Sequence, residues 1–199
     1  MLQRKFIVQS ADIAKRVWHL TAISNLSQIL GAGQGLLAKD LLQFSGVAYQ
    51  DISMQGVQQR RQQRWVFGYT LHQYVPLFFC QRNPMMCFHQ TRAAELVWLE
   101  IDVSALSMQA LVTSNGNAAC AVTEFQRGFV PSLPDWQVLT AATWNDAVDG
   151  KRKRAAELLC LGHVPAGAIR SLQVVGQVQR QQLVGFGLPV TINPRAFFC

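Results

Sequence analysis

Acidic side chains are scarce in this chain of 199 residues, in which 11 aspartates and glutamates stand against 18 lysines and arginines. No acidic residue occurs in the stretch 52–94, and none follows Glu157. The stretch 52–94 nevertheless carries several arginines, so it is not a balanced, solvated face. The net charge of +7 indicates a polyanionic partner, although it does not identify a fold.

Cysteine pairs and long apolar runs are also missing. The five cysteines are odd in number and contain no C-x-x-C pair, which argues against a disulfide framework and against a zinc site. We therefore expect reduced thiols in a cytoplasmic protein that holds no metal. No apolar run reaches membrane-spanning length, and residues 1–10 lack the apolar core of a signal peptide. We expect no membrane partner.

What the chain does have is enough apolar material for a core. Half of its residues are hydrophobic and 15% are charged, which excludes a disordered chain. No linker, internal repeat or low-complexity tail interrupts it, so residues 1–199 are expected to form a single domain. Expected strands and short helices interleave without regular βαβ spacing, which favours the α+β class.

The expected strands have apolar, β-branched and aromatic residues, and cover 17–21, 71–80, 95–103, an apolar run from Glu157, 169–178 and 189–193. Helices are expected at 24–30, with Ser24 as the cap, at 118–125 and at 136–143. The glutamine-rich segment 45–68 reads as an exposed amphipathic loop or helical turn.

A run of four cations leads into the last acidic residue of the chain. Lys151, Arg152, Lys153 and Arg154 are followed closely by Glu157, which opens an apolar segment of strand length. A carboxylate on a buried strand needs a cation or a hydrogen-bond donor. These residues alone leave two interpretations open: a strand-edge glutamate beside a solvated basic turn, or a catalytic carboxylate in a site that binds a polyanion.

Two further features carry possible chemistry. His19 and Thr21 alternate onto the same face of the expected strand 17–21, where a satisfied core histidine is the other interpretation. Arg60, Arg61 and Arg64 are the arginines before Arg82 that could reach one anionic ligand together, and guanidinium groups suit bidentate phosphate contacts.

Four segments in the same order then carry a resemblance. They are W-H-L-T with I-S-N-L and I-L at 18–30, V-Q-Q-R-R at 57–61, L-H-Q-Y-V-P-L-F-F with R-N-P-M at 71–85, and W-N-D with K-R-A-A-E-L-L at 144–159. These segments are similar to the motifs of the DarT family, toxins that ADP-ribosylate DNA. The resemblance spans nearly the whole chain, and its third segment is very specific.

The resemblance implies an ADP-ribosyltransferase fold, in which a split, mostly antiparallel β-sheet binds NAD in its cleft. It also implies an enzyme, a toxin-type transferase that moves ADP-ribose from NAD onto a thymine or guanine base of single-stranded DNA. A macrodomain-containing antitoxin of the DarG type would reverse the mark. We expect the chain to act as a monomer.

The resemblance assigns roles to single residues of this sequence. The catalytic pair would be Arg61 and Glu157. The NAD-binding residues would be His19, Leu20, Thr21, Gln28, Leu37 and Arg61. The DNA-contacting residues would be Arg82, Asn83, Pro84, Met85, Met86, Cys87, Thr143, Trp144 and Asn145. To these we add Lys151, Arg152, Lys153 and Arg154, because a strand held by these cations would bring its base to Glu157.

Several positions depart from the family pattern. Trp18 replaces a tyrosine, Ala22 a frequent histidine and Gln73 an aspartate, while the segment 193–198 lacks the usual tryptophan. These departures affect the expected base preference and leave the Arg61–Glu157 pair intact. The alternatives from other classes are a non-catalytic nucleic-acid-binding module on the same fold and an ADP-ribosyltransferase that acts on RNA or protein.

Overall fold

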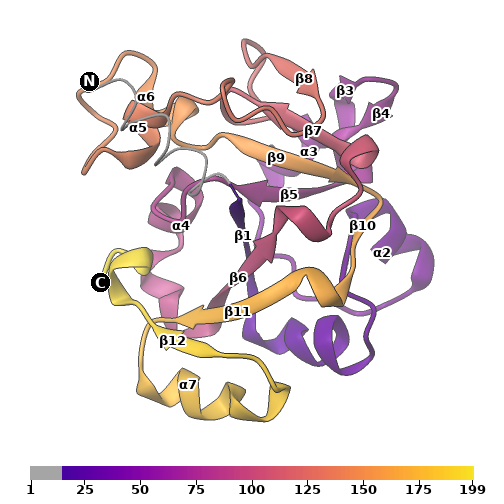
Figure 1. Ribbon diagram of the computed structural model, residues 1–199, viewed down its shortest axis with the longest axis vertical. Coiled ribbons are helices and arrows are strands. Elements are labelled where there is room, and N and C mark those ends of the chain that lie inside the picture. Colours follow the sequence, from indigo (N-terminus) through magenta and orange to yellow (C-terminus); the bar gives the residue numbers. More distant parts are fainter. Residues whose placement is uncertain (1–14) are drawn as a thin grey trace.

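The strand β1 (Arg16–Ala22) lies near the middle of an eight-stranded sheet with the order β12-β11-β6-β1-β5-β9-β7-β8 (Figure 1). The computed structural model describes residues 15–199, so the expectation of no signal peptide at 1–10 lies outside the described residues. The other strands of the sheet are β5 (Tyr74–Phe78), β6 (Leu96–Asp102), β7 (Leu111–Ser114), β8 (Phe125–Arg127), β9 (Glu157–Leu161), β11 (Ile169–Val174) and β12 (Val190–Ile192). Neighbours pair antiparallel except β11 and β12, which run parallel.

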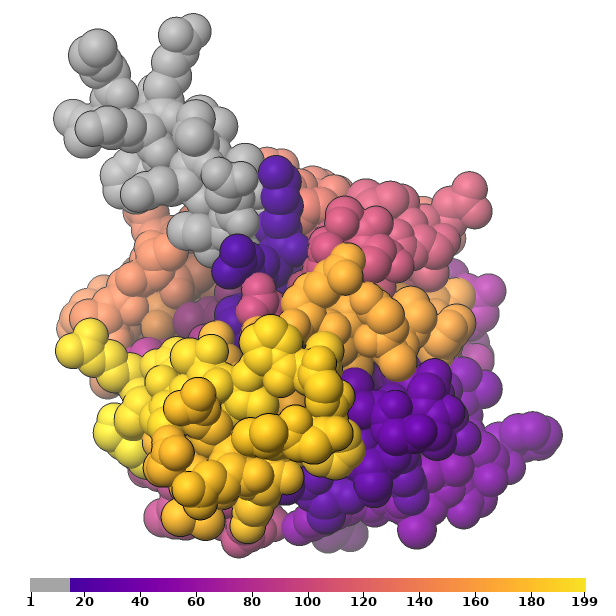
Figure 2. Space-filling model, turned by 60° about the horizontal axis from the view of Figure 1, so that its bottom comes forward, coloured from indigo at the N-terminus to yellow at the C-terminus, as the bar shows by residue number. Residues whose placement is uncertain are grey.

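Short elements surround this sheet. Two small two-stranded sheets pair β2 (Leu36–Leu37) with β10 (His163–Val164), and β3 (Trp65–Val66) with β4 (Tyr69–Thr70), and the second of these is a hairpin. The helices are α2 (Lys39–Ser45), α3 (Gln55–Gln63), α4 (Pro84–Phe88), α5 (Trp136–Thr140), α6 (Gly150–Lys153) and α7 (Gln177–Leu183). In Figure 2 the C-terminal segment with α7 (yellow) lies beside the residues that follow β1 (indigo), as it does in Figure 1. Within residues 15–199 every helix is too short or too polar to span a bilayer.

Buried apolar side chains fill both faces of the sheet. Leu77, Leu99 and Leu158 belong to one cluster, and Trp98 and Phe197 to another, and none of these side chains is exposed. Alternation along each strand sends successive side chains to opposite faces, so both clusters draw on the same strands. The sheet is therefore held rigidly from both sides around the point where it opens.

The sheet opens between β1 and β5. These strands share one residue pair, Trp18 with Phe78, whereas β1 and β6 share seven. Extending the register would place Leu20 opposite Pro76, whose nitrogen has no hydrogen to donate to β1. The His19 ring bonds the Pro76 carbonyl instead. The proline thus ends the ladder, and the two halves of the sheet diverge from that point.

The α+β class and the split, mostly antiparallel sheet are confirmed. The expected helix at 118–125 is wrong, because side-chain oxygens of Glu157 and Asn117 accept the backbone N–H groups of Ala118 and Ala119. The segment forms turns instead. Ser24 is not a helix cap: its hydroxyl bonds the Gln50 side chain.

Candidate functional site

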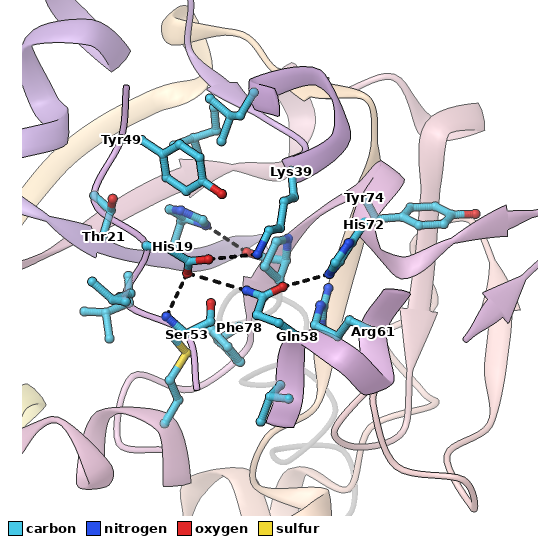
Figure 3. Close-up of a pocket in the computed structure, with 18 of the residues that line it drawn as sticks. His19, Thr21, Lys39, Tyr49, Ser53, Gln58, Arg61, His72, Tyr74 and Phe78 are labelled. Carbon is cyan, nitrogen blue, oxygen red and sulfur yellow. Dashed lines mark hydrogen bonds and ion pairs between the residues drawn. The ribbon is translucent and has the colours of Figure 1, made fainter. Parts of the chain in front are cut away.

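A cavity of about 520 Å³ occupies the opening between β1 and β5. Its walls come from β1, β5, α3, the start of β9 and the segment 47–54. Figure 3 shows His19 and Thr21 of β1 facing this space, with Gln58 and Arg61 of α3 opposite them. Every residue that was expected to be catalytic or to bind NAD lines this cavity: His19, Leu20, Thr21, Gln28, Leu37, Arg61 and Glu157.

Glu157 and Arg61 form an ion pair that is almost entirely withdrawn from bulk water. The Arg61 Nη1 lies 3.0 Å from Glu157 Oε2, and the two residues are 9% and 2% exposed. Arg61 Nη2 also donates to the Leu71 carbonyl, at 3.4 Å. A carboxylate at this depth is strongly unfavourable without a cation. The pair therefore joins α3 to β9 and keeps a negative charge at the cavity wall.

The backbone around Glu157 is fixed independently of its side chain. The Ser114 hydroxyl of β7 accepts the Glu157 backbone N–H at 2.9 Å. The second carboxylate oxygen, Oε1, accepts the Ala118 backbone N–H at 2.9 Å. Each carboxylate oxygen thus has a donor, which leaves the group with one orientation. Such a preorganised negative charge stabilises a positive charge that develops beside it.

His19 presents a neutral imidazole to the cavity. Its Nδ1–H donates to the Pro76 carbonyl at 2.9 Å, so the other ring nitrogen, Nε2, is the acceptor. Burial lowers the pKa of His19 from its ordinary value of 6.5, and the bond to Pro76 opposes this only in part. At neutral pH Nε2 can therefore accept a hydrogen bond from a hydroxyl or amide in the cavity.

A hydrogen-bond network on the wall beside Arg61 went unnoticed at the sequence level. Lys39 Nζ lies 2.8 Å from Asp51 Oδ2, Gln58 donates to Asp51 Oδ1 at 3.5 Å, and the His72 ring bonds Gln58 Oε1 at 2.7 Å (Figure 3). Gln58 is one helical turn before Arg61, so the network fixes the direction of α3. The signals available were Asp51, the last acid before the long acid-free stretch, and His72 within a recognised motif.

The Asn25 side chain connects β1 to the segment 47–54, which forms one wall of the cavity. The Asn25 amide donates to Thr21 Oγ1 and to the Gln50 carbonyl, at 3.0 Å each, and accepts the Gln50 N–H at 2.8 Å. Thr21, expected to hold NAD, therefore has its hydroxyl oriented by a neighbouring side chain. Asn25 belongs to the motif I-S-N-L at 23–26, and nothing in that motif alone indicates this role.

Comparison with known proteins assigns this geometry to a family. Residues 18–198 match the model of the family DarT, the ssDNA thymidine ADP-ribosyltransferase. The chain belongs to the DarT family. A DNA ADP-ribosyl transferase of Thermus sp. (strain 2.9) is 28% identical over 174 residues, which cover 81% of this chain and 81% of that protein.

Solved DarT structures share the fold. Thermus sp. 2.9 DarT in complex with ADP-ribosylated ssDNA superposes with a TM-score of 0.82 at 22% identity, covering 92% of this chain and 96% of that chain. Its complex with NAD+ gives 0.77 at 21% identity, covering 92% and 98%. Thermosipho africanus DarTG in complex with ADP-ribose gives 0.82 at 20% identity, covering 92% of this chain and 51% of that chain.

The DNA-contacting residues expected from the DarT resemblance at 82–87 divide into three groups. Pro84 and Met85 line the cavity, and Arg82 and Cys87 are half-buried outside it. Asn83 and Met86 are fully buried, so their expected contact with DNA is corrected here. The Asn83 side chain accepts the Met86 N–H at 3.0 Å and donates to the Cys80 carbonyl at 2.9 Å, which caps and positions α4.

The residues expected at 143–145 lie in the loop before α6, with Thr143 and Asn145 exposed. The Trp144 ring meets the Phe198 ring edge-on at 6.0 Å, and the Arg82 guanidinium lies 4.4 Å from the centre of the same Phe198 ring. Phe198 therefore joins two protein segments that are expected to contact DNA, at 82–87 and at 143–145. No role was expected for Phe198 itself.

The basic run 151–154 does not face one direction. Lys151 is exposed and lines the cavity. Lys153 pairs with Asp135 at 3.0 Å, and Arg152 pairs with Asp149 and donates to Asn115 Oδ1 at 2.7 Å. Arg154 is buried, at 3% exposure, so the expectation that it contacts DNA is corrected. Its guanidinium donates to the backbone carbonyls at 82, 138 and 141, and it holds the loops together.

No group of three or more metal-ligating side chains is found among residues 15–199. The five cysteines, all within that range, are free thiols. The cavity lining includes a fixed carboxylate, Glu157, its arginine, Arg61, and the neutral imidazole of His19.

Proposed function

We propose that this protein transfers ADP-ribose from NAD to a thymidine base of single-stranded DNA in the cavity that holds Glu157. The observation that carries the proposal is the buried Arg61–Glu157 pair at the opening of a split sheet, with His19 on the facing strand. Membership of the DarT family and similarity to DarT structures that hold NAD+ and ADP-ribosylated ssDNA support it.

NAD fits the cavity as the co-substrate. A volume of about 520 Å³ lies within the range of roughly 300–1,000 Å³ that ligand sites take. We assign the nicotinamide-ribose end to His19, Leu20 and Thr21, with Gln28 and Leu37 on the adjoining wall. Arg60 also lines the cavity and supplies positive charge for the diphosphate, whereas the charge of Lys39 is balanced by Asp51.

The transfer breaks the bond between the nicotinamide nitrogen and the ribose carbon, and the bonding electrons leave with nicotinamide. Positive charge then builds on the ribose, and the fixed Glu157 carboxylate stabilises it. Thymine has no exocyclic amine, and in the nucleotide its ring N–H is at N3. This nitrogen forms the new bond to ribose, and its proton passes to Glu157. Arg61 holds the carboxylate and contacts the NAD phosphates or the base.

The acceptor is single-stranded because the N3 position is paired and stacked inside a duplex. We assign Pro84, Met85 and Lys151, which line the cavity, to the nucleotide that enters it. Arg82, Trp144 and Phe198 form a cation–aromatic group that suits stacking and phosphate contact outside it. Cys87, Thr143, Asn145, Arg152 and Lys153 complete the assigned DNA surface.

We further infer that the protein is a toxin that acts as a single-domain monomer in the cytoplasm. A macrodomain-containing, DarG-type antitoxin would remove the ADP-ribose that it adds to DNA. Similarity to the DarTG chain of Thermosipho africanus, which is about twice as long as the matching part, supports the link to such a partner. Of the two bases, thymine is favoured over guanine because the family is one of thymidine ADP-ribosyltransferases.

NAD turnover measured with and without DNA tests the proposal. We expect nicotinamide release to rise strongly with a thymidine-containing single strand and to stay near background with the same sequence as a duplex. A non-catalytic binding module would release no nicotinamide with any nucleic acid, and an RNA or protein transferase would respond to those acceptors in place of DNA.

A further inference from the structure

Three aromatic side chains are exposed together on the β3–β4 hairpin, outside the cavity. Trp65 is 67% exposed, Tyr69 40% and Phe67 38%. The Arg127 guanidinium of β8 lies 4.5 Å from the centre of the Phe67 ring, and Arg127 is itself exposed. These four residues are called the hairpin surface below. None of them was assigned a role by the motifs or by the cavity.

The tip of this hairpin carries an aromatic residue where local geometry disfavours one. Phe67 has a φ of 50° and Gly68 a φ of 96°, so both turn residues lie at positive φ. Tight hairpin turns of this kind prefer Asn-Gly, and a bulky side chain at positive φ is uncommon. Turn stability therefore does not account for Phe67. Strain of this sort, retained at the surface, points to a contact that the ring makes with a ligand.

The charge around the hairpin surface suits a polyanion. The hairpin lies inside the acid-free stretch 52–94, and Arg64 at its base stacks on Phe125 at 5.2 Å. Glu124, just before β8, has its carboxylate bonded to the Asn115 side chain at 3.0 Å. Exposed aromatic rings interleaved with guanidinium groups bind single-stranded nucleic acid by stacking and phosphate neutralisation. A purely apolar partner would instead have to desolvate Arg127.

The hairpin is joined firmly to the cavity wall. Tyr74, which lines the cavity, donates to the Val66 carbonyl at 3.0 Å and meets the Tyr69 ring edge-on at 6.1 Å. Figure 3 shows the Tyr74 ring pointing away from Arg61, toward the hairpin side. Helix α3, which carries Arg61, ends at Gln63, two residues before Trp65. In Figure 1 the hairpin lies at the opposite end of β9 from α4 and α6.

We propose that the hairpin surface binds the nucleotides of single-stranded DNA that flank the target thymidine, on the side away from α4 and α6. The inference rests on the proposed function, because it takes the DNA strand through the cavity and out over β3 and β4. Bases stack on Trp65, Phe67 and Tyr69, while Arg127 neutralises the backbone.

The test compares binding of two labelled single strands, each with one central thymidine, of roughly four and roughly sixteen nucleotides, the range of site sizes for such grooves. Trp65→Ala should weaken binding of the longer strand about fivefold or more, as loss of one stacked base requires, and change the ratio of the two affinities. Phe44→Ala is the matched control, because Phe44 is 91% exposed on α2 and no cation lies against its ring in the described structure. It should bind both strands like the wild type.

Phe67→Asn separates binding from folding. Asparagine tolerates positive φ, so this variant should melt at the wild-type temperature or above it and still bind the longer strand more weakly. A lower melting temperature with unchanged DNA affinity would give Phe67 a structural role and overturn the proposal. Unchanged affinity of Trp65→Ala for both strands would also overturn the proposal. The same holds if the wild type forms a dimer that Trp65→Ala loses while DNA binding is kept, because the hairpin surface would then bind a second copy of the chain.

Failure of the proposed function has a different signature. A wild-type protein that modifies neither oligonucleotide in the presence of NAD would contradict the proposed function itself. A wild-type protein that modifies both, with a length preference that Trp65→Ala does not change, would contradict only the role of the hairpin surface.

Discussion

Replacing Glu157 by glutamine isolates the charge of the carboxylate from its geometry. The Glu157 backbone is held by Ser114, and a glutamine oxygen in place of Oε1 still accepts the Ala118 N–H. Glutamine has nearly the same shape, so the core cluster around β9 stays filled. Glu157→Gln should therefore fold, and its main loss is the negative charge that faces Arg61.

The size of the effect on rate follows from the two roles given to the carboxylate. Losing electrostatic stabilisation of the developing charge costs about 10²–10³ in rate. Losing the proton acceptor costs about 10²–10⁴. One group performs both roles, so the losses do not multiply freely, and we expect a fall of at least about 10³. The free energy of unfolding should also fall, by about 3–5 kcal/mol, because the buried Arg61 guanidinium loses its counter-charge and keeps only its bond to the Leu71 carbonyl.

The assay is single-turnover labelling of a thymidine-containing oligonucleotide, with circular dichroism and thermal melting as the folding check. Glu95→Gln is the matched control, since Glu95 is an exposed carboxylate paired with Arg92 and lies outside the cavity lining. It should label DNA at the wild-type rate. A folded Glu157→Gln protein that labels DNA within tenfold of the wild type would refute the reasoning.

Burial holds the pKa of His19 below 6.5, so the folded state favours the neutral ring. The contribution of His19 to the free energy of unfolding is complete above pH 6.5, and it is lost as the pH falls through the lower pKa of the folded state. NAD affinity should therefore decline in acid, and His19→Ala should weaken it about five- to tenfold at pH 7, as a lost hydrogen bond does, by calorimetry. His72, whose pKa burial also lowers, lies on the same wall, so the acid decline should be reduced in His19→Ala and not abolished. Arg154→Met should destabilise the fold by about 3 kcal/mol or more, because one buried and two partly buried carbonyls lose a charged donor, and the melting temperature should fall by roughly 6–12 °C. Lys151→Ala should leave melting unchanged and flatten the salt dependence of DNA binding by about one unit; equal melting temperatures for the Arg154 and Lys151 variants would contradict this division.

The parts of the fold that could be predicted from the sequence are those in which the local residue pattern determines the secondary structure. The apolar run from Glu157 became β9, and the expected strand 95–103 became β6. The expected strand 71–80 was shorter, because Thr70 and Gln73 form a reciprocal cap and residues 71–73 make a 3₁₀ turn. Gln73, a departure from the family pattern, is therefore a capping residue in the described structure.

The parts that could not be predicted depend on contacts between distant residues. The turn at 117–120 exists because Glu157 accepts the Ala118 N–H, a partner 39 residues away. The strand expected at 169–178 ends at Val174, and its last expected residues are wrong, because α7 begins at Gln177. The cavity residues were predicted only through the family resemblance, which assigned each of them to catalysis or to NAD binding. The charge argument that added the run 151–154 could not separate the exposed Lys151 from the buried Arg154, since both belong to one run of cations.

The most direct measurement is mass spectrometry of a single-stranded oligonucleotide with one thymidine, incubated with the wild-type protein and NAD. The account predicts a mass gain of one ADP-ribosyl group, located on the thymine base by fragmentation, with one nicotinamide released for each modified strand. It predicts no gain when that thymidine is replaced by cytidine. An unmodified strand, or a mass gain that persists in the cytidine oligonucleotide, would contradict it.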